Sequence, residues 1–118
     1  MHEIIFYKDN SGKEPVYELI RQLSKNDNKE NRIRLNKIND YIQVLSTYGI
    51  IANDNYMKHL DGEIWELRPR KDRILFFSYV NGSFVLLHHF AKKTQKTPKR
   101  EIEQAKRELA DFIERSNL

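Results

Sequence analysis

The sequence predicts an α+β fold, in which a small antiparallel or mixed sheet packs against an N-terminal helical hairpin and a C-terminal helix. Apolar residues recur at helical spacing over two segments in the first half of the chain and again at the C-terminal end. Four strand-length apolar runs lie between them and enclose two favoured hairpin turns, Asp61-Gly62 and Asn81-Gly82. The expected order of elements is β-α-α-β-β-β-β-α. No linker, repeat or low-complexity segment interrupts it, so residues 1–118 are expected to form one domain.

The first half of the chain is expected to supply one strand and the helical hairpin. Residues 3–7 have the composition of a short strand, and a turn signal follows them. A first helix should begin near Glu14, because Pro15 is tolerated in a first turn and apolar residues follow at helical spacing. A second helix should start at the capping-box pattern of residues 27–30 and end at Gly49.

The second half is expected to supply four strands and one helix. The apolar runs favour two hairpins, with strands over residues 56–60, 64–68, 73–80 and 84–92. Thr97 and Pro98 resemble the cap and first residue of a final helix. Its apolar stripe consists of Ile102, Ala105, Leu109, Phe112 and Ile113.

Isolated charges within the strands are the main functional signal. Burying an unpaired charge is costly, so Glu66 and Arg73 are expected to line a shared wet surface of the sheet. Alternation along a strand places Trp65 and Leu67 on the core side, and Glu66 with its neighbour at 68 on the opposite side. Lys58 can approach them from the neighbouring strand if the hairpin register permits. The structural alternatives are a solvated cross-strand ion pair for Glu66 and a rim charge for Arg73.

The adjacent histidines His88 and His89 must face opposite sides of a strand. One of them is therefore expected to be a hydrogen-bonded structural residue, and alternation does not say which one. Two adjacent histidines without a suitably spaced third ligand do not predict a metal site. Neither a metal nor another cofactor is expected.

The charge distribution favours an anionic partner. The chain has a formal net charge of +4, and residues 58–100 alone hold ten lysines and arginines against four aspartates and glutamates. Such a local excess of positive charge suits nucleic acid, although a solvated lysine-rich surface is the plainer explanation. The sequence has no cysteine, no run of membrane-spanning length and no signal-peptide pattern. A cytoplasmic protein that does not contact membranes is expected.

Several motifs of the second half resemble the RelE/HigB superfamily of type II toxin–antitoxin toxins, most closely its phage-related HigB-like branch. They are Lys58-His59-Leu60-Asp61-Gly62, Trp65-Glu66-Leu67-Arg68, Arg73-Ile74-Leu75-Phe76-Phe77 and the segment from Leu86 to Pro98, followed by Glu101-Ile102 and Ala105. The resemblance implies a RelE-like fold and a metal-independent mRNA interferase. Such an enzyme cleaves mRNA, commonly on the ribosome, and blocks translation until a cognate antitoxin neutralises it.

The resemblance also implies roles for individual residues. Glu66 matches the base that activates the 2′-hydroxyl, and Arg73 matches the arginine that stabilises the phosphate. Lys93 would be an acid or a phosphate clamp, and His89 is a second acid candidate. This chain carries Thr94, Gln95 and Thr97 where some relatives have a tyrosine. The RNA backbone would be bound by Lys58, Arg68, Arg70 and Lys92.

Partners follow from the same resemblance. The expected antitoxin is a helix-turn-helix protein. The toxin would contact operator DNA only as part of a complex with this antitoxin. The alternative function is a non-catalytic module that binds nucleic acid or protein alongside an antitoxin-like repressor. Glu66→Ala and Arg73→Ala are expected to abolish growth inhibition in the first case, with the fold left intact.

Overall fold

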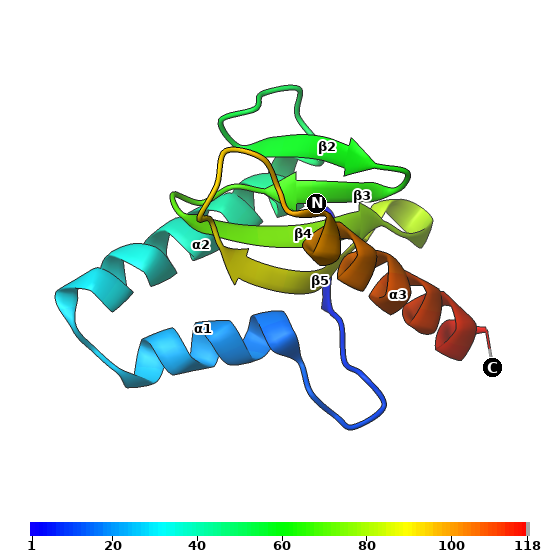
Figure 1. Ribbon diagram of the computed structural model, residues 1–118, viewed down its shortest axis with the longest axis horizontal. Helices are drawn as coiled ribbons and strands as arrows, with labels where there is room; N and C mark the ends of the chain where they lie inside the picture. The colour runs from blue at the N-terminus through cyan, green and yellow to red at the C-terminus, as the bar shows by residue number, and fades with distance from the viewer. Residues whose placement is uncertain (118) are drawn as a thin grey trace.

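A computed structural model describes residues 1–117 and contains a five-stranded mixed sheet with three α-helices (Figure 1). The predicted fold class and order of elements are confirmed. The strands lie in the order β1-β5-β4-β3-β2, with β1 parallel to β5 and every other neighbouring pair antiparallel. The elements are β1 (Ile4–Phe6), α1 (Pro15–Lys25), α2 (Lys29–Tyr48), β2 (Met57–Asp61), β3 (Ile64–Leu67), β4 (Asp72–Ser78), the 3-10 turn η1 (Val80–Gly82), β5 (Phe84–Ala91) and α3 (Lys99–Ser116).

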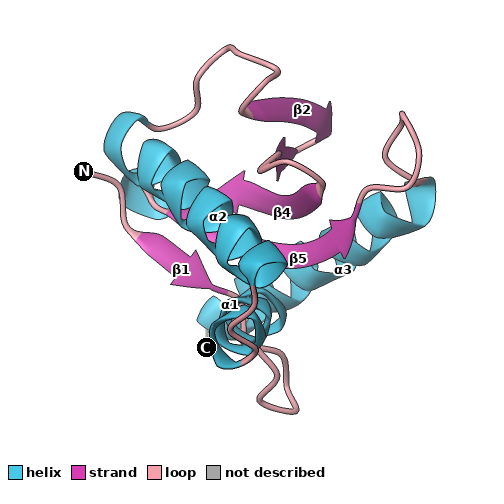
Figure 2. Cartoon of the chain, turned by 90° about the vertical axis from the view of Figure 1, so that its left-hand side faces the viewer, coloured by secondary structure: helices cyan, strands magenta, loops and turns pink. Residues whose placement is uncertain are grey.

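Helices cover both faces of the sheet. In Figure 1, α3 lies in front of the strands and α2 passes behind them. In Figure 2, which is turned by 90°, α2 lies nearest the viewer. The side chains of Ile74 and Phe76 in β4 pack in the core shared with α1 and α2, whereas Leu75 and Phe77 pack in the core under α3. A strand covered on both faces needs apolar residues at successive positions, which explains why β4 reads as an almost continuous apolar run.

This two-sided burial corrects the predicted face of Glu66. The sequence placed Glu66 on a wet face opposite Trp65, but Glu66 is only 1% exposed, and Trp65 is partly buried against the α1–α2 core. The parity itself was right, since Glu66 and Trp65 point to opposite sides. Covering one face by α3 turned the expected open surface into a partly enclosed one.

Two helix starts differ from the prediction by one residue. Helix α2 is capped by Asn28, whose side chain accepts a hydrogen bond from the backbone of Asn31 at 2.9 Å, and not by Asp27. Helix α3 begins at Lys99 with Pro98 at the cap position. The hydroxyl of Thr97 is therefore not used as a helix cap. Among residues 1–117, no helix is long and apolar enough to cross a membrane.

Glu108 on α3 is a buried carboxylate on the side of the helix that faces the sheet. It is 7% exposed, and its Oε1 has no hydrogen-bond partner among the described residues. Burial raises the pKa of Glu108, and the nearby His88 offsets part of that rise. Because the pKa of Glu108 is higher in the folded than in the unfolded chain, the protonated carboxyl stabilises the fold at low pH. This contribution is lost as the pH rises above about 4.3, the pKa of a glutamate in an unfolded chain.

Glu108→Gln is therefore expected to raise the free energy of unfolding at pH 7 by about 1 kcal/mol, because it removes an incompletely paired buried charge. The gain should shrink towards pH 4, where Glu108 itself is protonated. Urea unfolding at both pH values measures it. Glu114→Gln, at an exposed position of the same helix, is the control and should change little. A variant less stable than the parent protein at pH 7 would show that the carboxylate is well paired.

Candidate active site

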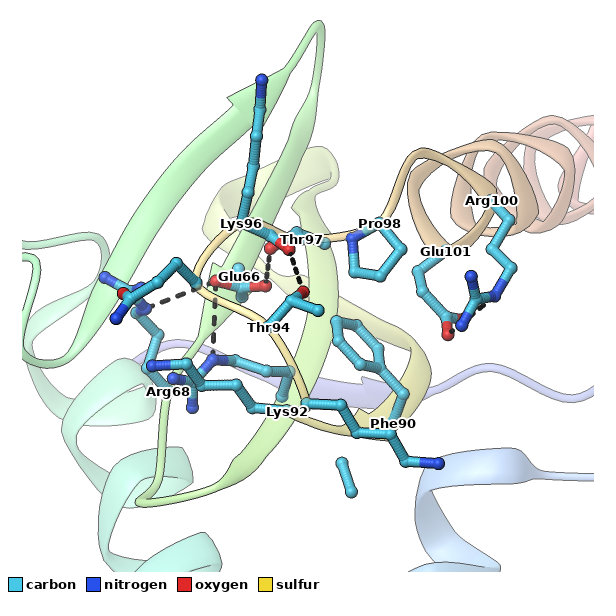
Figure 3. Close-up of a pocket in the computed structure, with 14 residues that line it drawn as sticks. Glu66, Arg68, Phe90, Lys92, Thr94, Lys96, Thr97, Pro98, Arg100 and Glu101 are labelled. Carbon is cyan, nitrogen blue, oxygen red and sulfur yellow. Dashed lines mark hydrogen bonds and ion pairs between the residues drawn. The ribbon is translucent and has the colours of Figure 1, made fainter.

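A pocket of about 290 Å³ lies where β5 ends and the loop to α3 begins (Figure 3). The strands place its central residues, because Glu66 in β3 pairs with Leu75 in β4, and Arg73 in β4 pairs with Phe90 in β5. Glu66, Arg73 and Phe90 thus share the sheet face that α3 covers. The charged residues that line the pocket are Glu66, Arg68, Arg73, Lys92, Lys93, Lys96, Arg100 and Glu101.

Three side chains surround the Glu66 carboxylate. Its Oε1 lies 3.3 Å from Nε of Arg68 and 3.7 Å from Nε of Arg73. Its Oε2 accepts a hydrogen bond from the Thr97 hydroxyl at 2.5 Å. Figure 3 shows Thr97, on the loop that precedes α3, and Arg68 beside Glu66. A buried charge is tolerated here because it is both paired and hydrogen-bonded.

Arg73 is held on two sides. Its Nη1 donates hydrogen bonds to the carbonyl oxygens of Arg70, at 2.7 Å, and Asp72, at 2.9 Å, while its Nε faces Glu66. Burial lowers the pKa of Arg73, and the Glu66 carboxylate opposes that effect. Asp72 is itself fixed by two hydrogen bonds from Arg34, at 2.8 and 3.1 Å. The guanidinium of Arg73 is therefore positioned before any ligand binds.

The predicted RNA-binding residues lie in and around the pocket. Arg68 lines it and donates a hydrogen bond from Nη1 to the carbonyl of Asp54 at 2.8 Å. Lys58 pairs with Glu66 in the β2–β3 register and lines an adjoining pocket. Lys92 lines the main pocket, but Arg70 lies outside it, on a neighbouring surface that Lys92 also lines.

Lys93 lies in the main pocket, whereas His89 does not. His89 pairs with Ile74 and faces the α1–α2 side, where it lies beside residues of α1, and burial lowers its pKa. This placement argues against His89 as an acid in the same site as Glu66. His88 is on the α3 side, with its Nε2 2.7 Å from Oε1 of the pocket residue Glu101.

The resemblance placed Lys92, Lys93 and the threonines of the β5–α3 loop near the site, but it did not indicate the contact between Thr97 and Glu66. Thr97 was predicted to cap a helix, and its hydrogen bond to Glu66 spans 31 positions of the chain. A single sequence carries no signal for such a long-range contact, beyond the presence of a hydroxyl near other polar residues. The other pocket residues to which the sequence assigned no individual role are Phe90, Ala91, Lys96, Arg100 and Glu101.

The arrangement combines carboxylates able to accept a proton, those of Glu66 and Glu101, with several cations able to stabilise negative charge. Neither Lys92 nor Lys93 forms an ion pair with a described residue, so both ammonium groups can bind an external anion. Within residues 1–117, no three His, Asp or Glu side chains are grouped so that they could hold a metal ion. The pocket therefore suits an anionic ligand that carries an acidic hydroxyl or loses a proton during reaction.

Comparison with known proteins identifies the family. No curated protein matches the chain. A family model described as "Phage derived protein Gp49-like (DUF891)" matches residues 20–110, which is most of the chain and includes every residue that lines the pocket. The chain therefore belongs to the Gp49-like family of phage-derived proteins.

Proposed function

We propose that the protein is the toxin of a type II toxin–antitoxin pair and acts as an mRNA interferase of the RelE/HigB type. Membership of the Gp49-like family supports a phage-derived, toxin-like protein. The observation that carries the enzymatic part is the placement of Arg68 and Arg73 beside one carboxylate oxygen of Glu66, in the lining of a cationic pocket. RNA cleavage needs a proton acceptor and cations at the same phosphate, and these residues supply both.

In the proposed reaction Glu66 accepts the proton of the RNA 2′-hydroxyl, and the 2′-oxygen attacks the adjacent phosphorus. Arg73 and Arg68 stabilise the extra negative charge on the phosphoryl oxygens. Lys93, at the exposed side of the pocket, donates a proton to the leaving 5′-oxygen as the P–O5′ bond breaks. The products are a 2′,3′-cyclic phosphate and a free 5′-hydroxyl.

The proposed partners follow from this function. A cognate antitoxin would neutralise the enzyme and, through its own DNA-binding domain, carry the complex to operator DNA. The mRNA would be presented on the ribosome, in the cytoplasm. Lys58, Arg68, Arg70 and Lys92 would contact the RNA backbone around the scissile phosphate, at positions where the structure gathers positive charge.

Expression without an antitoxin tests this function. An interferase is expected to arrest growth and to shorten cellular transcripts, whereas a module that only binds nucleic acid would leave transcript lengths unchanged. The purified protein without ribosomes is expected to cut RNA in the presence of EDTA, because the mechanism uses side chains only. Loss of cleavage on chelation, restored by a divalent ion, would contradict the proposed mechanism.

A further inference from the structure

The loop between β5 and α3 separates two pockets that meet at Glu66. One is the main pocket of about 290 Å³, and the other, of about 200 Å³, lies on the side of Lys58 and β2. Both are lined by Glu66 and Arg68 and by the loop residues Gln95, Lys96 and Thr97. The loop therefore forms the wall between them. We call its residues 92–98 the strap, and Figure 3 shows Lys96 and Thr97 on the part that crosses beside Glu66.

One side-chain hydrogen bond holds this strap to the sheet among the described residues. At its start, the backbone of Lys92 donates a hydrogen bond to the carbonyl of Lys71 at 2.7 Å, and after it α3 is held through Glu101 and His88. Between these anchors, the hydrogen bond from Thr97 to Glu66 is the one side-chain bond from the strap to a strand among the described residues. The Thr94 hydroxyl bonds within the strap, to the carbonyl of Lys96.

In this closed arrangement Glu66 is unable to act as a base on RNA. It is 1% exposed, its Oε2 is occupied by the Thr97 hydroxyl, and its Oε1 faces two arginines. The Thr97 hydroxyl donates to a carboxylate oxygen in the way that a ribose 2′-hydroxyl would have to donate in the proposed reaction.

We propose that Thr97 is a latch, whose hydroxyl holds the place of the RNA 2′-hydroxyl on Glu66 until the substrate displaces it. This inference rests on the proposed function. Release of the strap joins the two pockets into one groove across Glu66, with Lys58 at one end and Lys92, Lys93 and Arg100 at the other. A single RNA strand lies along this groove, its phosphates near the cations at both ends. Thr97 is thus a positioning residue and not a catalytic one.

The test compares Thr97→Val, which keeps the shape of the side chain but removes the hydroxyl, with Thr97→Ser, which keeps the hydroxyl. A hydrogen bond to a charged group is strong enough that its loss should raise the open population by about 10-fold. Limited trypsin digestion measures that population through the rate of cutting after Lys96. We expect Thr97→Val to be cut about 10-fold faster and to lose about 1.4 kcal/mol of unfolding free energy, the equivalent of that 10-fold change. Thr97→Ser should match the parent protein in both properties.

A second measurement connects the latch to RNA. The ligand is a short single-stranded RNA with one 2′-deoxy residue at the scissile position, which is bound but not cleaved. Thr97→Val is expected to bind it up to about 10-fold more tightly, because the competing closed state is weakened. Equal tryptic rates for the Val and Ser variants would overturn the latch. Faster cutting with unchanged RNA affinity would overturn the claim that the strap blocks RNA. Faster cutting with no RNA binding by any variant would support the latch and overturn the proposed function instead.

Discussion

Glu66→Gln is expected to lower RNA cleavage by about 10²- to 10⁴-fold, the usual contribution of a positioned general base. Glutamine has nearly the same shape, and its carbonyl oxygen can still accept the hydrogen bond from Thr97. It is unable to take the proton of a 2′-hydroxyl at neutral pH, so catalysis is lost while RNA binding remains. Single-turnover cleavage of a defined RNA measures the effect, and growth after induction measures it in cells.

Glu63→Gln is the matched control, because Glu63 is an exposed carboxylate in the same β2–β3 hairpin. It should cleave RNA at the parental rate. If Glu66→Gln remained fully toxic, the base would have to lie elsewhere. Glu66→Ala is a weaker test than the sequence suggested, because it would leave the charges of Arg68 and Arg73 facing an unfilled buried space. The variant could then lose activity through unfolding, and the assay would not distinguish this from loss of the base.

The architecture was predictable from the sequence because its signals are local. Helical spacing, turn signals such as Asp61-Gly62 and runs of strand-forming residues depend on neighbours within about ten positions. The face that Glu66 occupies was harder to predict, because alternation separates Glu66 from Trp65 but does not say which side a distant helix covers. The nearly continuous apolar run of β4 is typical of a strand that is buried on both faces, and it is the one sequence signal for this burial.

Register explains the uncertainty over the histidines. The β4–β5 pairing shifts between Leu75 and Phe76, so that side-chain parity in β5 does not follow from counting along β4. His88 therefore falls on the side of Glu66, and His89 falls opposite. The sequence predicted that His88 and His89 would face opposite sides of the sheet, but it carries no signal for the position of the register shift. The contact between Thr97 and Glu66 was unpredictable for a similar reason, since it depends on where an irregular loop crosses the finished sheet.

Arg73→Lys tests the other half of the proposed chemistry. The arginine has three acceptors on two sides, namely the carbonyls of Arg70 and Asp72 and the carboxylate of Glu66. One ammonium group does not reach all of them, because it lacks the planar fork of a guanidinium. We expect cleavage to fall by about 10²- to 10³-fold, as when one preorganised donor to a transition state is removed, and the free energy of unfolding to fall by about 1–3 kcal/mol.

Arg32→Lys, within an exposed ion pair with Asp27, is the matched control and should change neither property. Both variants are assayed for cleavage at a temperature where urea titration shows them to be folded, so that stability and chemistry are separated. If Arg73→Lys were less stable but fully active, Arg73 would be a structural support for the turn at residues 69–72. Stabilisation of the phosphate would then fall to Arg68, whose guanidinium lies on the same side of Glu66 and is more exposed than that of Arg73.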